Sequence, residues 1–358
     1  MIHTDVLIVG AGPAGLSAAI EIGATGANVI LLERSNVAGG QLIKQTHMFF
    51  GSEKQYASYR GYEISDILLK EAESMPNVCI KLQATVLAAY DDGTWTADIE
   101  GEYTKIKPKV VVVATGAAEK SLPFPGNDLP GVCGAGALQT LMNQYGVKPA
   151  ENVVMLGAGN IGLIVSYQLL QANVNVLALA EGSQKIGGYL VHASKLRRLG
   201  VPIMTGYTVK EALGTTALEA VTLWKIDENW QGIAGSEITF SVDALCIAVG
   251  LSPLAELLWQ AGCKMLYVPS LGGYVPYRDK SLCTSIENIF IAGDVAGVEE
   301  ASAAMVEGRL AGLSAIKHLG IDLPNQSATE ADYYAQLASL RNGHSGEKIL
   351  SGLSKATL

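Results

Sequence analysis

Hydrophobic and polar positions follow the same order twice along the chain. Residues 6–9 form an unbroken apolar run, which a glycine-rich turn and an alanine- and isoleucine-rich stretch separate from a second apolar run ending at Glu33. The same order recurs over residues 152–181, where the second apolar run ends at Glu181. Continuous apolar runs of this length predict strands buried on both faces, and the stretch between them predicts a helix. Each region is therefore predicted to be a βαβ unit of a parallel sheet.

The uncharged stretch at residues 153–180 resembles a membrane span by hydropathy alone. Glycine and asparagine interrupt it, however, at Gly157, Gly159, Asn160, Gly162, Asn173 and Asn175, which favours strand, turn, helix and strand. No transmembrane segment is predicted. The first residues lack the basic segment and the small-residue cleavage site of a signal peptide, so a cytoplasmic location is expected.

Each glycine-rich turn carries a dinucleotide-binding fingerprint of the form G-x-G-x-x-G. The first glycine permits a tight turn, the second lets a pyrophosphate approach the backbone, and the third lets the helix pack on the strand. The phosphates then lie at a helix N-terminus, where free N–H groups favour anions. The predicted cofactor-binding residues are Gly10, Gly12, Pro13, Ala14, Gly15, Glu33 and Arg34 in the first copy, and Gly157, Gly159, Asn160, Ile161, Gly162 and Glu181 in the second.

A repeated phrase follows each second strand, "ERSNVAGGQL" from Glu33 and "EGSQKIGGYL" from Glu181. We interpret it as the strand end and the following loop of two related nucleotide-binding folds. A carboxylate at this place accepts hydrogen bonds from ribose hydroxyls and repels a 2'-phosphate, which favours NAD over NADP. A second fold that binds nothing remains an alternative.

Two further segments end in residues typical of ligand sites. Residues 109–116 form a strand that ends in Ala114, Thr115 and Gly116, followed by a proline-containing crossover. Residues 285–294 form another strand that ends in Gly293 and Asp294, followed by an alanine-rich helix. An acid at the carboxyl end of a strand lies where open α/β sheets bind ligands. A helix N-cap or turn acid is the alternative for Asp294.

Together with the first fingerprint, these segments resemble the family of flavoproteins with two dinucleotide-binding domains, which share the plan of thioredoxin reductase. The resemblance implies an α/β fold with two Rossmann-like domains, the second inserted in the first, and a short C-terminal tail. It implies FAD in the first fold, with Gly40, Gln41, Thr115, Gly116, Gly293, Asp294 and Ala301 among the residues that bind it. The expected domains are residues 1–118 plus 251–320 for FAD and residues 119–250 for an NAD-type nucleotide. A tail follows at 321–358, for which docking on a partner is one of two alternatives.

Composition agrees with two packed domains. The chain has 358 residues, more than one ordinary core accommodates, and 49% hydrophobic residues against 16% charged leave little material for disorder. The net charge of −9 disfavours nucleic acid as a partner. No metal site, disulfide framework or thioredoxin-type dithiol is predicted, because the five cysteines lie far apart, at Cys79, Cys133, Cys246, Cys263 and Cys283.

The region that holds a C-x-x-C in thioredoxin reductase has Cys133 alone here. A dithiol–disulfide reductase is therefore disfavoured, because one thiol cannot close an internal disulfide. Three other segments are informative, "GGQLIKQTHMFFGS", "GDVAGVEEASAAMVEGRLAG" and "LASLRNGHSGEKILSG". They resemble the FAD/NAD-type subunit of heteromeric amine and amino-acid dehydrogenases, such as sarcosine oxidase, proline or hydroxyproline dehydrogenase and hydrogen cyanide synthase.

This closer resemblance implies a complex. A separate flavoprotein subunit would oxidise a secondary amine, and this chain would pass the electrons onward. A small iron–sulfur subunit, an FMN at a subunit interface, NAD in the second fold, and ATP or NAD in place of FAD in the first all stay open.

The catalytic residues are not identified, and Lys44 and His47 are weak candidates, because they follow the strand end where the isoalloxazine is expected. A solvated Lys44 and a structural His47 are the alternatives. No arrangement typical of a general base is present, which suits an electron relay, since hydride transfer between flavin and nicotinamide needs none.

The polar segment from Pro324 is predicted to hold one short helix around residues 333–340 and either to dock on a partner subunit or to fray. Two further functions remain in play. One is a stand-alone NADH-dependent FAD reductase without a redox disulfide, and the other is a non-catalytic scaffold that binds a nucleotide.

Overall fold

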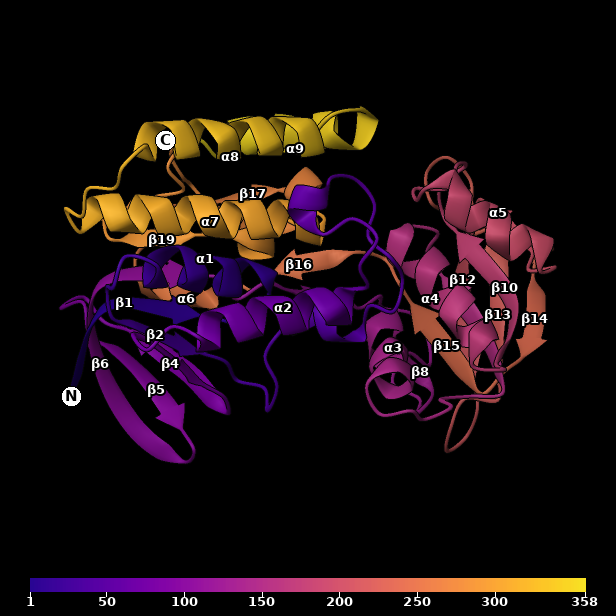
Figure 1. Ribbon diagram of the computed structural model, residues 1–358. Helices are drawn as coiled ribbons and strands as arrows, with labels where there is room; N and C mark the ends of the chain where they lie inside the picture. Colours follow the sequence, from indigo (N-terminus) through magenta and orange to yellow (C-terminus); the bar gives the residue numbers. More distant parts are fainter. The chain divides into compact units, whose positions relative to one another are not determined.

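The computed structural model describes residues 1–358, apart from the side chains of residues 344 and 345 (Figure 1). The chain divides into two compact units, residues 1–118 with 252–358, and residues 119–251. The chain crosses between them twice, at the short strands β7 (Ala117–Glu119) and β16 (Leu251–Pro253), which pair with each other. The interrupted α/β plan expected from the sequence is confirmed.

The first unit is built on a seven-stranded sheet of order β3-β2-β1-β6-β5-β4, with β19 added to β6. The strands next to β1 are parallel to it, while β4 and β5 turn back as an antiparallel extension of the long strand β6. The strands are β1 (Ile2–Val9), β2 (Val29–Leu32), β3 (Val78–Lys81), β4 (Ala84–Ala89), β5 (Trp95–Ile99), β6 (Glu102–Val113) and β19 (Ile289–Ile291). A separate antiparallel pair consists of β17 (Met265–Val268) and β18 (Gly273–Pro276).

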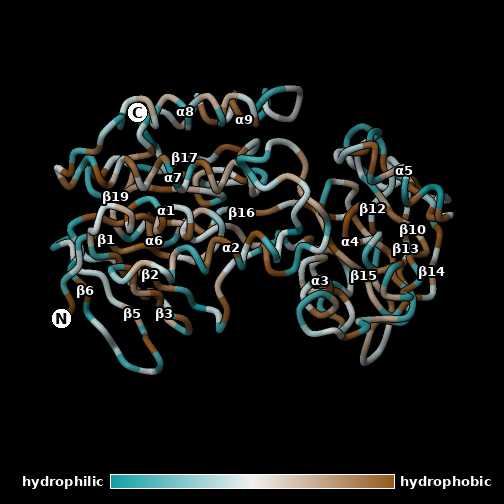
Figure 2. Tube along the Cα trace, viewed as in Figure 1, coloured by the Kyte–Doolittle hydropathy of each residue, from teal (hydrophilic) through white to brown (hydrophobic). Residues whose placement is uncertain are grey.

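Both faces of β1 are buried, which explains its unbroken apolar run. Val6 and Ile8 belong to the core that includes residues of the helices α1 (Pro13–Gly23), α2 (Gly61–Glu73) and α7 (Ala301–His318). Leu7 and Val9 belong to a second core, shared with β5 and the short helix α6 (Glu256–Gln260). Successive side chains of a strand point to opposite faces, so a strand covered on both sides needs apolar residues throughout. Figure 2 shows the same concentration of hydrophobic residues along the central strands.

The second unit repeats this plan with a five-stranded parallel sheet of order β11-β10-β9-β15-β8. The sheet strands are β8 (Val132–Gly134), β9 (Asn152–Leu156), β10 (Asn175–Glu181), β11 (Ile203–Thr205) and β15 (Ala244–Ile247), and the helices are α3 (Ala135–Asn143), α4 (Asn160–Gln171) and α5 (Leu190–Arg198). An antiparallel sheet completes the unit, with β12 (Tyr207–Leu213), β13 (Ala220–Lys225) and β14 (Ile238–Ser241). Among the described residues, no helix is both long enough and apolar enough to cross a membrane.

The C-terminal segment differs from its prediction. In place of one short helix it forms two, α8 (Gln326–Leu340) and α9 (His344–Lys355), and both belong to the first unit. The buried face of α8 consists mainly of Tyr333 and Leu337, four residues apart, and these belong to the same hydrophobic core as the buried residues of α7. So narrow an apolar stripe leaves the segment polar in composition, which is why it suggested a tail without a core.

Four short 3-10 helices connect these elements, η1 (Gly40–Lys44), η2 (Glu53–Gln55), η3 (Pro269–Leu271) and η4 (Gly293–Ala296). Two of them, η1 and η4, carry residues that the sequence assigns to the cofactor site.

Candidate functional site

The turn between β1 and α1 depends on two glycines that have no room for a side chain. Gly10 has a φ of +100°, and a Cβ built on it would lie 2.5 Å from the carbonyl oxygen of Ala114 on the neighbouring strand. A Cβ on Gly15 would lie 1.8 Å from the carbonyl oxygen of Gly10. The first glycine therefore lets the turn pass close to the β6 strand, and the third lets α1 pack on the turn, as the fingerprint predicts.

Gly12 differs, because the nearest atom to its built Cβ is the Cα of Gly40, at 3.9 Å. Gly12 is also the N-cap of α1, where it has no side chain to satisfy the first N–H groups, and Pro13 occupies the first helical turn. Uncapped N–H groups at a helix N-terminus form an anion site. The open space at Gly12 thus lies where a pyrophosphate would meet α1.

Glu33 is buried and fixed to this turn. One carboxylate oxygen, Oε2, accepts the N–H of Ala11 at 2.9 Å, and the other, Oε1, accepts the N–H of Ser35 at 2.9 Å. Each carboxylate oxygen accepts more than one hydrogen bond, so both retain capacity for ribose hydroxyls. Arg34, the next predicted residue, is exposed.

The Gly-Gly pair of the repeated phrase packs back onto the turn. The N–H of Gly39 donates to the carbonyl oxygen of Ala11 at 2.7 Å. Gly40 has a φ of +55°, and a Cβ on it would lie 2.8 Å from the Cα of Gly12. The pair therefore has a structural reason, which is the close contact between the loop and the fingerprint turn.

The residues after Gly40 are less closely tied to the turn. Gln41 is exposed at the start of η1, and Lys44 ends η1 in a half-buried position. The ring of His47 stacks on Phe49 with 5.7 Å between centroids. A catalytic role for Lys44 or His47 stays a prediction.

Thr115 and Gly116 follow β6 and anchor the returning chain. The hydroxyl of Thr115 donates to the carbonyl oxygen of Leu254 at 2.7 Å, and the N–H of Leu254 donates to the carbonyl oxygen of Gly116 at 2.9 Å. A Cβ on Gly116, whose φ is +76°, would meet no atom within 4 Å.

Asp294 lies close to the β1–α1 turn because the residue before it, Gly293, has no side chain. A Cβ on Gly293 would lie 3.0 Å from the Cβ of Ala14, so the turn after β19 packs on the first turn of α1. The Asp294 Oδ1 atom accepts the N–H of Glu299 at 3.2 Å. Burial, together with the neighbouring carboxylates, raises the pKa of Asp294 to about 7. Ala301 begins α7 shortly afterwards.

The second fold repeats this geometry. A Cβ on Gly157 would lie 2.2 Å from the carbonyl oxygen of Ala248, and one on Gly162 would lie 2.0 Å from that of Gly157. A Cβ on Gly159 would meet nothing within 4 Å. The turn of the second fold therefore has the same open position beside a helix N-terminus, that of α4.

The carboxylate and the Gly-Gly loop of the second fold also match the first. Glu181 accepts the N–H of Ala158 at 2.8 Å through Oε2 and that of Ser183 at 2.9 Å through Oε1. The N–H groups of Gly187 and Gly188 both donate to the carbonyl oxygen of Ala158, at 3.1 and 2.9 Å. The repeated phrase therefore has the same structural role in both units.

Two of the predicted residues on α4 have different surroundings. The Oδ1 atom of Asn160 accepts the N–H of Tyr189 at 2.9 Å, which ties the start of α4 to the loop before α5. Ile161 is 38% exposed.

Residues 4–308 match the family model described as pyridine nucleotide-disulphide oxidoreductase. The chain belongs to this family. Membership makes it an FAD-dependent oxidoreductase and implies binding of FAD and of NAD or NADP. The first site fits an FAD, because it combines an open glycine at a helix N-terminus with two carboxylates, the buried Glu33 and the half-buried Asp294.

Curated relatives of this oxidoreductase are subunits of larger enzymes. The opine oxidase A chain of Agrobacterium tumefaciens (strain Ach5), one of the subunits of that enzyme, is 28% identical, with 91% of this chain and 68% of the relative aligned. The alpha chain of sarcosine oxidase from Rhizobium meliloti (strain 1021) is 28% identical over 90% of this chain, which spans only 31% of that protein. The HcnB chain of hydrogen cyanide synthase from Pseudomonas protegens is 29% identical, over 93% of this chain and 75% of the relative. The resemblance drawn from the sequence is confirmed.

A solved structure supports the fold of this family member. The thioredoxin reductase of T. acidophilum superposes with a TM-score of 0.72 at 23% identity, over 89% of this chain and 99% of that one. The two-domain plan of thioredoxin reductase is therefore present.

The cysteines of this oxidoreductase differ from a redox dithiol. Cys133 of β8 and Cys246 of β15 are neighbours in register, and both are free. Burial raises the pKa of Cys133 to about 11 and raises that of Cys246 well above its usual range. Both are therefore thiols at neutral pH, the protonated and less reactive form.

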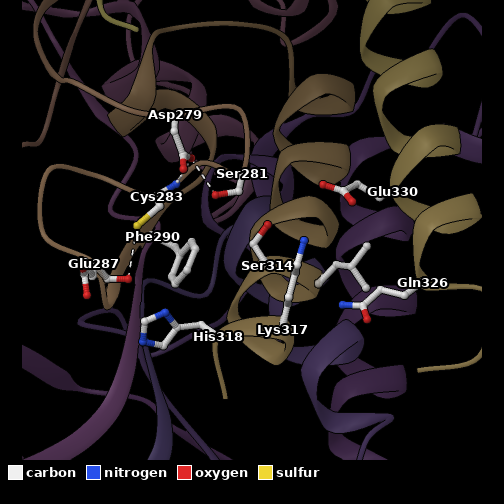
Figure 3. Close-up of a pocket in the computed structure, with 11 residues that line it drawn as sticks. Asp279, Ser281, Cys283, Glu287, Phe290, Ser314, Lys317, His318, Gln326 and Glu330 are labelled. Atoms are coloured by element: carbon white, nitrogen blue, oxygen red, sulfur yellow. Dashed lines mark hydrogen bonds between the residues drawn. The ribbon is translucent and has the colours of Figure 1, made fainter. Parts of the chain in front are cut away.

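A pocket of about 320 Å³ lies in the first unit near the end of α7, apart from the fingerprints (Figure 3). Its walls include Asp279, Cys283, Lys317, His318 and Glu330. Asp279 accepts the hydroxyl of Ser281 at 2.6 Å and the N–H of Cys283 at 2.9 Å, so its carboxylate is used within its own turn. No sequence-predicted cofactor residue lines this pocket, and we do not assign it to the oxidoreductase site.

Sequence reasoning missed a group of charged residues linked to the segment that carries Asp294, formed by Arg278, Glu299, Glu307 and Arg341. We refer to these four residues as the buried charge cluster. The one signal in the sequence is Glu307, an acid within an alanine-rich helix that is buried on most sides. Burial of such an acid requires a cationic partner, but the sequence does not show which arginines supply it.

Proposed function

We propose that the chain is the electron-transferring FAD subunit of a multi-subunit amine or amino-acid dehydrogenase or oxidase. The observation that carries this proposal is the pairing of two nucleotide-binding turns, each with an open glycine and a fixed carboxylate, in a chain without a C-x-x-C. Opine oxidase, sarcosine oxidase and hydrogen cyanide synthase support it, because each similar chain is a named subunit of its enzyme.

FAD, when bound, supplies hydride and electron transfer. The chain's own residues would bind and orient it. The N–H groups at the start of α1 receive the pyrophosphate, and Glu33 receives ribose hydroxyls. Asp294 would accept a hydrogen bond from a ribityl hydroxyl, with the N–H of Glu299 holding its carboxylate in place. The positive N-terminal end of α7 would favour negative charge on a flavin bound beside it.

In the second fold, we propose NAD as the nucleotide. Glu181 is held by Ala158 and Ser183 in the arrangement that Glu33 has in the first fold, and a fixed carboxylate there disfavours a 2'-phosphate. An ATP or NAD in the first fold, an FMN at a subunit interface, an iron–sulfur partner and a cytoplasmic location stay predictions.

A stand-alone NADH-dependent FAD reductase is the second candidate. The open position at Gly159 supports it as well as the main proposal, because this position leaves room for a second dinucleotide in the same chain. A scaffold that binds a nucleotide without catalysis is disfavoured by membership of an oxidoreductase family.

The test begins with the nucleotides that the purified chain releases on denaturation, identified by chromatography and mass. Stoichiometric FAD supports the proposed site, and ATP or NAD without flavin contradicts it. Dye reduction is then measured with sarcosine, proline or hydroxyproline, and separately with NADH. Amine-dependent reduction that requires a co-expressed partner supports the subunit role. Steady NADH oxidation by the isolated chain, with no response to a partner, would instead assign it to the second candidate.

A further inference from the structure

The buried charge cluster is centred on Glu307, in the middle of α7, whose side chain is 3% exposed. Its Oε1 atom accepts hydrogen bonds from Arg278 at 3.1 Å and from Arg341 at 2.6 Å. Its Oε2 atom accepts the backbone N–H of Gly293 at 3.0 Å. Two guanidinium groups and one N–H therefore compensate the burial of this carboxylate.

Arg341 forms a second contact, a two-bond fork with Glu299. Its Nε atom donates to Oε2 of Glu299 at 2.9 Å, and its Nη2 atom donates to Oε1 at 2.7 Å. Parallel N–H···O bonds of this kind fix orientation as well as distance. Arg341 thus connects Glu299 directly to Glu307.

The cluster holds both ends of the segment that carries Asp294. Gly293, immediately before it, donates to Glu307, and Glu299, five residues later, donates its own N–H to the Asp294 carboxylate. Because Arg341 fixes the Glu299 side chain, it also limits movement of the Glu299 backbone. The position of the Asp294 carboxylate therefore depends on a residue from the far end of the chain.

Arg341 lies at the end of α8, beyond the residues 4–308 that match the family model. The α8 helix runs along α7 (Figure 1), and the hydroxyl of Tyr333 donates to Oε2 of Glu21 at 2.7 Å. The last residues of the chain also fix the position of Arg278. Its backbone N–H donates to the carbonyl oxygen of Ala356, and its carbonyl oxygen accepts the N–H of Leu358, both at 2.9 Å. Both arginines of the cluster thus depend on the C-terminal segment for their position.

Around Asp294 and the buried charge cluster, acidic side chains outnumber basic ones. Asp294, Glu299 and Glu307 supply three carboxylates, and Arg278 and Arg341 supply two guanidinium groups. Burial and the adjacent carboxylates accordingly raise the pKa of Asp294. Loss of Arg341 would remove the guanidinium that pairs with Glu299 and leave Glu307 with Arg278 and the Gly293 N–H, and loss of either arginine would make the surroundings of the segment more negative.

We propose that Arg341 is a positioning residue of the flavin site, through which the C-terminal helices set the affinity and the reduction potential of the bound FAD. This inference rests on the proposed flavin function and extends it to a part of the chain outside the family model. Reduction adds negative charge to the flavin, so a more negative surrounding makes reduction less favourable. Arg341 raises the potential by its charge and raises the affinity by fixing the segment from Gly293 to Glu299.

The experiment uses the full chain, depleted of flavin and titrated with FAD, with affinity read from flavin fluorescence and the midpoint potential from a dye-coupled titration. Arg341→Gln should weaken FAD binding about tenfold or more, the order expected for a lost hydrogen bond to a charged group. Its midpoint potential should be more negative than that of the wild type. Arg341→Lys keeps the charge without the fork, so its potential should stay near the wild-type value while its affinity falls.

Two further variants separate positioning from general stability. Tyr333→Phe removes another buried contact of α8, away from the buried charge cluster, and should lower the melting temperature while affinity and potential stay unchanged. Glu299→Gln breaks the same fork from the other side but removes a negative charge. It should weaken FAD binding and shift the potential in the positive direction, opposite to Arg341→Gln, and it serves as the test if Arg341→Gln fails to fold.

Wild-type affinity and potential in folded Arg341→Gln would overturn the proposal. An equal loss of FAD affinity in Tyr333→Phe would also overturn it. So would a midpoint potential that shifts in the same direction in Glu299→Gln and Arg341→Gln. A wild-type chain that takes up no FAD would refute the proposed function itself, and that result is distinguishable because it precedes any comparison of variants.

Discussion

Gly12 and Gly15 lie three residues apart in one turn, yet the structure predicts opposite effects when each is replaced by alanine. Gly12→Ala should abolish FAD binding and leave the fold intact. Gly15→Ala should damage the fold. The difference lies in what the added methyl group meets. At Gly12 it makes an ordinary contact with the Cα of Gly40, and at Gly15 it overlaps the carbonyl oxygen of Gly10.

The magnitudes follow from these contacts. At Gly15 the methyl carbon would lie 1.8 Å from an oxygen that normally stays about 3.3 Å from carbon, so the backbone must shift by more than about 1 Å. Overpacking of this kind costs up to about 3 kcal/mol, and replacing a helical glycine such as this one, in the first turn of α1, regains at most about 1 kcal/mol. The net loss is about 2 kcal/mol, or a melting temperature about 4 to 8 °C lower.

At Gly12 the backbone has a φ of −76°, which alanine adopts without strain. Alanine is less favourable than glycine at an N-cap, which lowers the stability. It also reduces the entropy of the unfolded chain, which raises the stability, and each effect is below about 1 kcal/mol. Stability should therefore change by less than about 1 kcal/mol. The methyl group nevertheless fills the space through which a pyrophosphate reaches the N–H groups of α1.

The assay pairs thermal unfolding, followed by circular dichroism, with FAD titration of the flavin-depleted chain. Gly159→Ala and Gly162→Ala form the matched pair in the second fold, with NADH as the ligand, because their added methyl groups meet nothing within 4 Å and an oxygen at 2.0 Å, respectively. Wild-type FAD affinity in Gly12→Ala would refute the location of the site. A wild-type melting temperature in Gly15→Ala would refute the packing argument.

Three further predictions concern single groups. Burial raises the pKa of Asp294 from 3.8 to about 7, so the folded flavin-depleted chain binds this proton more tightly than the unfolded chain and should lose up to about 4 kcal/mol of unfolding free energy as the pH rises from about 4 to about 7. Urea unfolding at both pH values should show this loss reduced in Asp294→Asn, and equal losses would contradict the assignment. Glu181→Ala should narrow the preference for NADH over NADPH, measured as the ratio of the two dissociation constants, and an unchanged ratio would remove its role. Exposed Cys79 should react with iodoacetamide at neutral pH before Cys133, whose pKa burial raises to about 11, and the reverse order in peptide mass spectrometry would contradict the structure.

The sequence predicts the two fingerprint turns well because their geometry is local. The spacing of Gly10, Gly12 and Gly15 encodes which positions must lack a side chain, and the neighbours that impose this requirement lie within the same βαβ unit or on the adjacent strand. The apolar runs at residues 6–9 and 153–156 are also local signals, because a strand covered on both faces needs apolar residues at every position.

The C-terminal helices and the buried charge cluster could not be predicted in the same way. Arg341 and Glu299 are far apart along the chain, and their contact depends on how α8 lies on α7. The helix itself shows only a narrow apolar stripe at Tyr333 and Leu337, which composition does not distinguish from a polar tail. Long-range pairing of charges leaves no periodic signal in one sequence.

The two folds differ at the strand that completes each sheet, and the difference favours flavin in the first. In the first unit β19 lies beside β6 and is followed by Gly293, Asp294 and α7, and in the second unit β8 lies beside β15 and is followed directly by α3. The second unit has no acid after its strand. Instead, the carboxylate of Glu119 accepts the N–H of Gly136 at 2.7 Å, at the start of α3. The Glu119 carboxylate therefore already occupies a backbone N–H at the start of α3 that could otherwise bind a ligand. We therefore expect the second fold to bind only the part of a dinucleotide near Gly159 and Glu181 tightly, whereas the first also holds the flavin end.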